Sequence, residues 1–193
     1  MTTYIIKPLG PDTWDDFAGL IERQVNGWAP SCWCTNFHPS DPDDNGTKEG
    51  RRAFKELLVE RGRAHAALVF DGDLAVGWCQ YGTLEELPSI HHRKEYEAGL
   101  VTVPQYRLTC IFVDKVYRKR GVAAAALQGA LDLIADAGGG VVEGYPHDLP
   151  EGKKMSSSFL YNLTRSAYEQ VGFTYQRSKG KGNCVMTITV PPH

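Results

Sequence analysis

A basic turn that opens into small residues is the part of this sequence best suited to binding an anion. An apolar run over residues 108–113 predicts a buried strand, and Arg118, Lys119 and Arg120 follow it directly before Gly121 and Ala123. The first turn of a helix offers unpaired backbone N–H groups and the positive end of the helix dipole. Because small side chains let a phosphate approach that backbone, the spacing predicts a phosphate site at the start of a helix. A solvated basic turn is the other interpretation that this short string allows.

An acidic residue inside a second apolar run marks another candidate site. Glu143 lies within residues 141–145, which read as a strand. A carboxylate on such a strand requires either a role in chemistry or a buried partner. His147 and Asp148 follow at the end of this strand, where ligand sites of α/β proteins are often found.

Two cysteines and a histidine lie close together near the start of the chain. Cys32, Cys34 and His38 have a spacing that offers three zinc ligands, but no second compact pair would complete a tetrahedral site. No neighbouring base would activate either thiol. The five cysteines are odd in number, and three lie in apolar runs, so we expect reduced thiols and no disulfide scaffold. We expect no metal, and a loop that Trp33 anchors beside a substrate pocket.

The elements that must position these residues follow from periodicity and turn signals. Apolar runs predict strands at residues 4–7, 65–70, 74–81, 108–113, 141–145, 173–177 and 184–190. Apolar stripes predict helices over about 11–21, 47–58, 121–137 and 159–170. The charged segment 83–105 fits a short helix or a loop. The predicted fold class is α/β, with one domain over residues 1–193, a mixed central sheet of about seven strands, and helices on both faces.

Composition and charge disfavour several classes of partner. The 193 residues include 21 basic and 23 acidic residues, so the formal net charge is -2. No general positive field is available to hold duplex DNA or an acidic membrane, and we expect neither as a partner. No apolar stretch approaches the roughly 20 residues that span a bilayer, and the first residues lack the pattern of a signal peptide. We therefore expect a cytoplasmic protein, and we leave a homodimer open.

The basic turn and a second motif near the end of the chain together resemble a known superfamily. Arg118, Gly121 and Ala123 match the pattern Q/R-x-x-G-x-G/A of the pyrophosphate loop in GNAT acyltransferases, which use acetyl-coenzyme A. Residues 166–173, SAYEQVGF, resemble the recurrent L-Y-E-K-x-G-F helix end of that superfamily, with Ala167 in place of its leucine. Both motifs occur in the expected order, so the resemblance covers nearly the whole chain and implies a GNAT-like fold.

Three short stretches resemble one bacterial group within the superfamily. They are Cys32-Trp33-Cys34, Glu143-Gly144-Tyr145-Pro146 and Phe159-Leu160-Tyr161. This narrower resemblance implies no particular substrate.

The superfamily resemblance implies where acetyl-coenzyme A, the expected co-substrate, would bind. In GNAT proteins the strand before the loop and the next parallel strand splay apart, and the pantetheine arm lies in the gap. In this chain the arm would meet Phe112 and Val113, and Arg118 would assist the pyrophosphate. The pyrophosphate itself would lie on the backbone of Arg120, Gly121, Val122 and Ala123.

The resemblance also implies direct attack of an amine on the thioester, without a covalent enzyme intermediate. The amine must lose a proton and the departing thiolate gains from receiving one, so a base and an acid are needed on opposite sides of the thioester. Tyr168 matches the tyrosine of the family motif and is the candidate acid, with a packed helix aromatic as its structural alternative. Residues 108–113 lack the glutamate that many relatives carry there. The candidate bases are Glu143 and, acting through a water, His147 or Asp148.

These residues lead to one functional hypothesis and one alternative. We expect an N-acetyltransferase that moves the acetyl group of acetyl-coenzyme A to a primary amine of a small molecule or peptide. The alternative is a sensor or scaffold domain that binds acyl-coenzyme A without turnover, which the presence of Tyr168 and Glu143 disfavours. The acceptor would contact residues 27–46, 82–105 and 147–158, whose mixed charges favour neither a polyanionic nor a strongly cationic acceptor.

Overall fold

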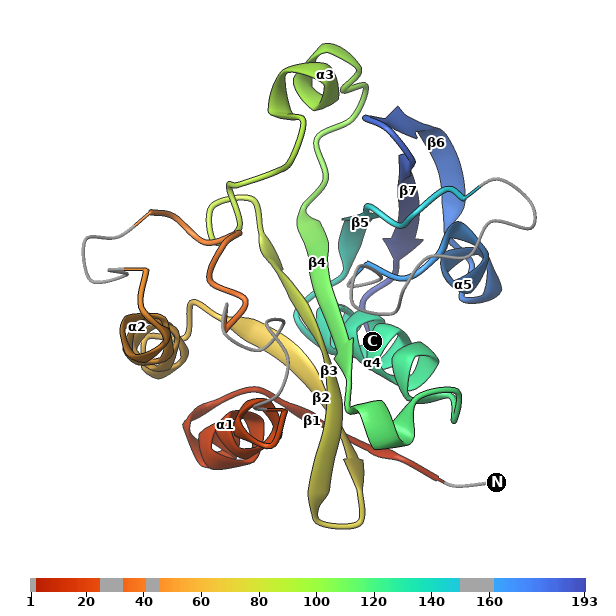
Figure 1. The fold of residues 1–193 in the computed structure, drawn as a ribbon. Helices are drawn as coiled ribbons and strands as arrows, with labels where there is room; N and C mark the ends of the chain where they lie inside the picture. Colours follow the sequence, from red (N-terminus) through yellow and green to blue (C-terminus); the bar gives the residue numbers. More distant parts are fainter. Residues whose placement is uncertain (1–2, 25–32, 41–45, 150–161) are drawn as a thin grey trace.

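Seven strands form one mixed sheet (Figure 1). The computed structural model describes residues 3–24, 33–40, 46–149 and 162–193. The strands are β1 (Ile5–Pro8), β2 (His65–Asp71), β3 (Leu74–Thr83), β4 (Tyr106–Val113), β5 (Gly140–Gly144), β6 (Thr174–Lys179) and β7 (Asn183–Val190). Their order across the sheet is β1-β2-β3-β4-β5-β7-β6. Strands β4 and β5 are parallel, while the other described neighbours are antiparallel. The predicted α/β class and mixed sheet are confirmed.

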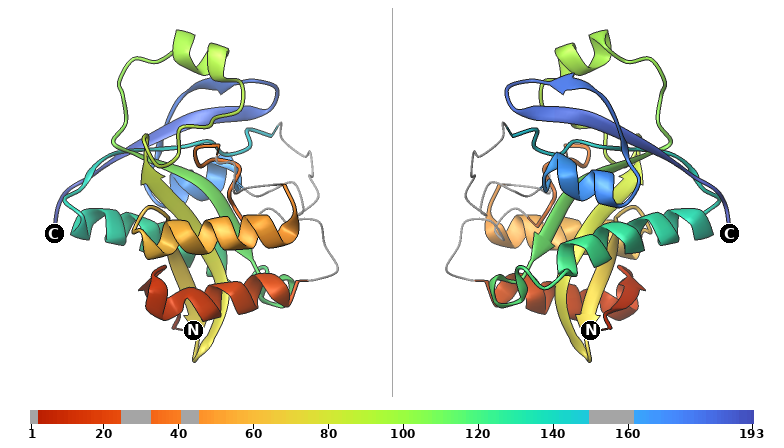
Figure 2. Two further views of the ribbon diagram at one scale, coloured as in Figure 1. Left: turned by 90° about the vertical axis from the view of Figure 1, so that its left-hand side faces the viewer. Right: turned by 90° about the vertical axis from the view of Figure 1, so that its right-hand side faces the viewer.

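Helices cover both faces of the sheet, as the sequence predicts (Figure 2). They are α1 (Trp14–Glu22), α2 (Lys48–Glu60), α3 (Arg93–Ala98), α4 (Val122–Asp136) and α5 (Arg165–Gln170). Helices α1 and α2 lie on one face, and α4 and α5 lie on the other. Helix α3 lies beyond the end of β3 and the start of β4, close to the β6–β7 hairpin. Among the described residues, no helix has both the length and the apolar character needed to cross a membrane.

Each face of the sheet carries its own apolar core. On the α1 face, Phe17 packs edge-on against Trp78 of β3, with ring centroids 5.1 Å apart. On the α4 face, Leu127 and Ile134 are fully buried against the central strands. The apolar stripes that the sequence predicts for α1 and α4 are therefore the surfaces that hold these helices on the sheet.

The structure shows a short helix within the segment 83–105, which the sequence leaves undecided, and it shortens the helix predicted over 159–170. Residues 93–98 form α3, and the segments on either side of it are turns and loop up to the start of β4. Helix α5 begins at Arg165, later than expected, because Leu163 has a left-handed backbone (φ 58°) and Thr164 is extended. The predicted start of this helix, residues 159–161, lies outside the described residues.

Candidate functional site

Strands β4 and β5 part after a short paired stretch. Tyr106, Arg107 and Leu108 lie opposite Val142, Glu143 and Gly144. Strand β3 accompanies β4 as far as Val113, whereas β5 ends at Gly144 (Figure 1). The chain after β5 stays beside β7, where the Cys184 N–H donates a hydrogen bond to the Pro146 carbonyl at 3.0 Å. No described strand lies on the β5 side of β4 beyond Leu108, so the backbone there presents a free edge. Such an edge can hydrogen-bond an extended ligand in the way that it would bond another strand.

A β-bulge lies at the point where the two strands part. Gln80 of β3 pairs with Cys110 and Tyr81 pairs with Leu108, so Thr109 is an extra residue in β4. Bulges often lie next to active sites because they redirect side chains. Here the bulge places two successive side chains on the α1 and α2 face: Thr109 accepts a hydrogen bond from Gln80 Nε2 at 3.0 Å, and Cys110 packs against the core beneath α1.

The turn between β4 and α4 leaves the start of the helix open. Asp114 Oδ1 accepts a hydrogen bond from the Val116 backbone N–H at 3.0 Å and shapes the 3-10 turn η3 (Lys115–Tyr117). Gly121 precedes α4 with a left-handed backbone (φ 84°), and apart from its two chain neighbours no atom of the described residues lies within 4 Å of the position that its Cβ would take. Because the first N–H groups of a helix have no partner within it, this open turn can hold an anion.

The predicted coenzyme-binding residues lie along one continuous path. They run from the unaccompanied end of β4 to the first turn of α4: Phe112, Val113, Arg118, Arg120, Gly121, Val122 and Ala123. Arg118 and Arg120 are exposed at the helix start. Tyr4 Oη donates a hydrogen bond to the Arg120 carbonyl at 3.1 Å, which fixes the backbone of the turn against the segment before β1. The structure therefore brings these residues together with the geometry of a strand edge leading to a helix N-terminus.

Tyr168 of α5 lies against the end of β5. A Cβ at Gly144 would overlap Cε1 of the Tyr168 ring and would lie 3.0 Å from its hydroxyl, so the close approach requires glycine. Phe173 packs against the other part of the ring, with centroids 4.8 Å apart. The Tyr168 hydroxyl has no hydrogen-bond partner among the described residues, and burial holds its pKa well above the ordinary value of about 10. The phenol is thus a protonated donor beside the point where β4 and β5 part.

Glu143 has buried partners, one of the two options that its sequence position allows. Its Oε2 accepts hydrogen bonds from Tyr96 Oη at 2.7 Å and from Tyr145 Oη at 2.9 Å. Arg107 is its neighbour across the β4–β5 pairing and is also buried. Lys179 lies 5.2 Å from the Tyr145 ring, and burial lowers the pKa of its ammonium to about 8. Glu143 therefore belongs to a compact charged cluster under α3, on the face opposite Tyr168.

His147 lies two residues beyond the hydroxyl-bearing Tyr145, and backbone bonds hold it in place. Its N–H donates to the Leu163 carbonyl at 2.9 Å, and its carbonyl accepts from the Arg165 N–H at 2.9 Å. Asn183 Nδ2 lies 3.4 Å from the His147 ring nitrogen Nδ1. His147 thus joins the start of α5 to the start of β7. The structure does not place it in the cluster of Glu143.

The loop after α1 is anchored as the sequence predicts. Trp33 is buried and stacks on Trp14, with centroids 5.9 Å apart, and it meets Phe17 edge-on. Cys34 is buried beside it, with its Sγ 2.9 Å from the Cys110 Sγ. Cys32 lies outside the described residues. Within the described parts of the chain, no group of three or more potential metal ligands comes together.

A buried polar network on the α2 face escaped the sequence analysis. Lys55 Nζ donates to Gln80 Oε1 at 2.7 Å and lies 3.0 Å from His38 Nε2. His38 Nδ1 lies 3.0 Å from the Glu86 carbonyl, so this nitrogen carries the proton and Nε2 accepts from the lysine. Burial and the charge of Lys55 lower the pKa of His38 to about 2. Through Gln80 the network reaches the bulge residue Thr109.

The available sequence signal for this network was the position of Lys55 on the buried side of α2. Lys55 lies four residues before the buried Val59 and next to the buried Phe54, so it falls within the apolar stripe of the helix. A lysine is almost never fully buried without a partner. The position of Lys55 therefore predicts a buried acceptor, although the sequence does not reveal which one.

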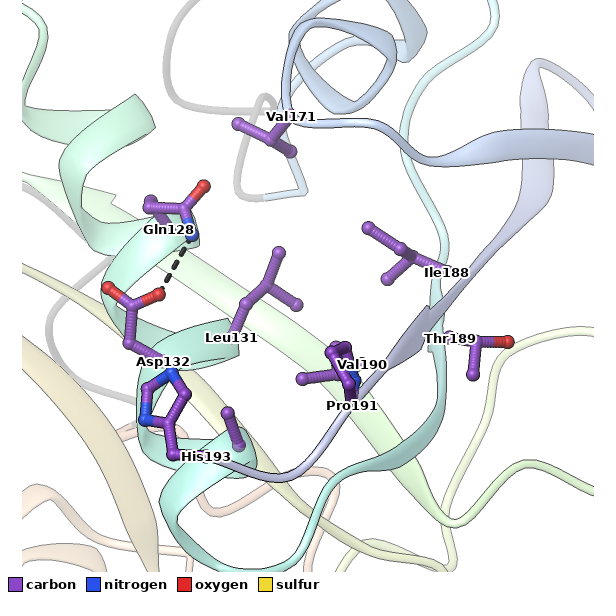
Figure 3. Close-up of a pocket in the computed structure, with 10 residues that line it drawn as sticks. Gln128, Leu131, Asp132, Val171, Ile188, Thr189, Val190, Pro191 and His193 are labelled. Carbon is purple, nitrogen blue, oxygen red and sulfur yellow. Dashed lines mark hydrogen bonds between the residues drawn. The ribbon is translucent and has the colours of Figure 1, made fainter.

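A separate cavity of about 200 Å³ lies between the second half of α4 and the end of β7 (Figure 3). Leu131, Ile188 and Val190 line it with apolar side chains, and Gln128 and Asp132 are hydrogen-bonded to each other at its edge. None of the candidate catalytic or coenzyme-binding residues lines this cavity.

Comparison with known proteins finds similarity at the level of structure. No family model matches the chain, and no curated protein matches it in sequence. A GNAT-family protein from Desulfovibrio desulfuricans has a TM-score of 0.54 and 15% identity, over 97% of this chain and 99% of its own. The GNAT-family acetyltransferase from Streptococcus pneumoniae has a TM-score of 0.51 and 13% identity, over 97% and 99%. The PaiA N-acetyltransferase from Thermoplasma acidophilum, in complex with coenzyme A, has a TM-score of 0.52 and 13% identity, over 97% and 99%.

These matches extend across almost the whole chain. Identity of 13–15% supports a shared fold and leaves substrates undefined. The chain therefore has the fold of the GNAT acetyltransferases, as the two sequence motifs predict.

Proposed function

We propose that the protein is an N-acetyltransferase that transfers the acetyl group of acetyl-coenzyme A directly to a primary amine of a small molecule or peptide. The observation that carries this proposal is the free edge of β4, with an open helix N-terminus at one end and Tyr168 at the other. The fold it shares with acetyltransferases, one of them bound to coenzyme A, supports the same function.

The free edge of β4 suits an extended ligand with amide groups. Five residue steps from Leu108 to Val113 span about 16 Å at the usual rise of a strand. An arm with amides can exchange backbone hydrogen bonds along this edge, near Phe112 and Val113. The anionic end of the ligand would then meet the open first turn of α4, where Gly121 leaves room for a phosphate.

The acid role falls to Tyr168. Its phenol is protonated, lies at the end of the free edge opposite the phosphate turn, and has no hydrogen-bond partner among the described residues. It can therefore donate to a sulfur that becomes negatively charged as the thioester breaks. A donor already engaged by the protein would need to break that bond first.

The base role falls to the opposite face of the sheet, where Glu143 lies. Its carboxylate is shared by Tyr96 and Tyr145, so a proton from the amine would reach it through a water or through one of these hydroxyls. His147 is the second candidate base and lies in a separate part of the structure. The pH dependence of the Glu143→Gln variant distinguishes the two.

The test measures binding and turnover separately. We expect calorimetry to detect coenzyme A binding, and a thiol-release assay with acetyl-coenzyme A to detect turnover with at least one member of a panel of primary amines. Absence of coenzyme A binding would refute the proposal. Tight binding without thiol release for any amine would instead support the sensor alternative.

A further inference from the structure

Two thiols from distant parts of the chain meet next to the candidate site. Cys34 belongs to the loop after α1, and Cys110 belongs to β4. Their sulfur atoms are 2.9 Å apart. A disulfide bond requires a sulfur–sulfur distance of about 2.05 Å, so closing it needs a movement of only about 0.9 Å.

The loop that contains Cys34 and the bulge beside Cys110 each have a fixed geometry, and together they bring the two thiols into contact. The buried and stacked Trp33 anchors the loop, and both Trp33 and Cys34 have left-handed backbones (φ 46° and 55°) that non-glycine residues adopt rarely. On the other side, the bulge at Thr109 turns Cys110 onto the face where the loop lies. The approach therefore results from the fixed geometry of the loop and of the strand.

The remaining described cysteines are poorly suited to oxidation. Cys79 and Cys184 are fully buried, and burial raises the pKa of both thiols, to about 12 for Cys184. Cys110 differs because it is partly exposed, so a small oxidant can reach it. Of the described thiols, Cys110 is thus accessible and has a second thiol, Cys34, in contact.

We propose that Cys34 and Cys110 form a reversible disulfide, a modification site that ties the loop of residues 33–40 to β4 and slows acetyl transfer. The oxidant is a peroxide. The Cys110 sulfur attacks one oxygen of hydrogen peroxide and the O–O bond breaks, which leaves a sulfenic acid on Cys110 and releases water. The Cys34 sulfur then attacks the Cys110 sulfur, the S–O bond breaks, and a second water leaves. The two thiols lose two electrons and two protons, and a thiol reductant restores them.

The effect on transfer rests on the proposed function. Tyr168 lies on the α5 face, so the amine approaches the thioester from the opposite face, which carries Cys110 and Glu143. The loop of residues 33–40 lies on this acceptor face. A covalent tie to β4 would prevent the loop from moving aside for an acceptor, while the free edge of β4 and the phosphate turn would stay open to coenzyme A.

The first experiment tests the disulfide without reference to activity. Purified protein is treated with hydrogen peroxide, digested with trypsin and analysed by mass spectrometry. We expect residues 24–48 linked to residues 108–115, with fragmentation placing the bond on Cys34, and we expect dithiothreitol to abolish the link. The link should disappear in Cys34→Ala and Cys110→Ala and persist in Cys32→Ala and in the control Cys184→Ala. Free thiols after treatment, or a bond from Cys110 to any other cysteine, would overturn the proposal.

The second experiment tests the tie and its consequence. Chymotrypsin should cleave oxidised protein after Trp33 and Phe37 at least 5-fold more slowly than reduced protein. This result does not depend on whether the protein is an acetyltransferase. With an accepted amine, oxidation should lower kcat/KM about 10-fold or more in the wild type and leave coenzyme A affinity within 2-fold. Cys34→Ala should have the same rate before and after peroxide treatment, whatever its rate relative to the wild type. A mapped disulfide with unchanged cleavage would refute the tie between the loop and β4. A mapped disulfide with unchanged turnover would refute its effect on acetyl transfer. Failure of coenzyme A binding would refute the proposed function alone.

Discussion

Replacing Tyr168 by phenylalanine should separate the chemistry of this residue from its packing. The change removes the hydroxyl and keeps the ring that packs on Gly144 and Phe173. If the phenol donates to the departing thiolate, thiol release should fall roughly 100-fold, which corresponds to about 2.7 kcal/mol of transition-state stabilisation. Coenzyme A affinity should stay within about 2-fold, because the acid acts only as the sulfur becomes charged.

Stability should respond in the opposite way to the usual loss of a tyrosine hydroxyl. A buried hydroxyl that makes a hydrogen bond contributes about 1 kcal/mol, but the Tyr168 hydroxyl has no partner among the described residues. Tyr168→Phe should therefore leave the free energy of unfolding within about 0.5 kcal/mol of the wild type, or raise it. The matched control is Tyr145→Phe, which removes a 2.9 Å hydrogen bond to the buried carboxylate of Glu143. The control should lose about 1.5–3 kcal/mol, or roughly 3–12 °C in Tm.

Denaturant unfolding and thiol release on the same preparations decide the matter. An undiminished rate for Tyr168→Phe would refute the acid assignment. A loss of stability as large as that of Tyr145→Phe would show that the hydroxyl is bonded in the folded protein, and the fall in rate could then reflect a displaced α5.

Four further changes test other parts of the structure. Gly121→Val should weaken coenzyme A binding more than 10-fold by calorimetry while the protein stays folded, because valine strains the left-handed backbone of the turn (φ 84°) and its side chain lies where a phosphate would meet that backbone; unchanged affinity would reject the phosphate turn. Gly144→Ala should cost about 1–3 kcal/mol in denaturant unfolding, because the new methyl group overlaps the ring of Tyr168, and a neutral effect would contradict this contact. Glu143→Gln should reduce the rate most at low pH and least at high pH, where the free amine is abundant; an equal defect at every pH would point to a structural role or to another base. His38, neutral in the folded protein with a pKa lowered to about 2, takes up a proton on unfolding below its ordinary pKa of 6.5. The contribution of His38 to the free energy of unfolding is complete above pH 6.5 and decreases by about 1.4 kcal/mol for each pH unit below it. His38→Gln should therefore flatten the decline in stability between pH 6.5 and pH 4. A slope identical to that of the wild type would contradict the buried neutral histidine.

Local features of the sequence determined most of the elements and their order. The Asp71-Gly72-Asp73 turn between β2 and β3 was predictable because Gly72 adopts the left-handed backbone (φ 60°) that such turns require. Helix α4 was predictable from its apolar stripe and from the glycine at Gly138 that follows it. The phosphate turn was also visible, since strand, basic turn and helix start are contiguous in the chain. Each of these features depends on residues within a few positions of one another.

Only the tertiary structure decided which distant residues meet. The order of the strands places β7 between β5 and β6, and the parting of β4 from β5 depends on how far two strands stay in register. The sequence allowed Glu143 to be either a free base or a buried residue with a partner. The structure shows a partner, because Tyr96, 47 positions away in the chain, donates a hydrogen bond to its carboxylate. Lys55 reaches Gln80 and Cys34 reaches Cys110 across separations of 25 and 76 positions. Hydrophobic periodicity reports which face of an element is buried, but it carries no information about which side chain lies opposite, because that depends on register, twist and packing over the whole sheet.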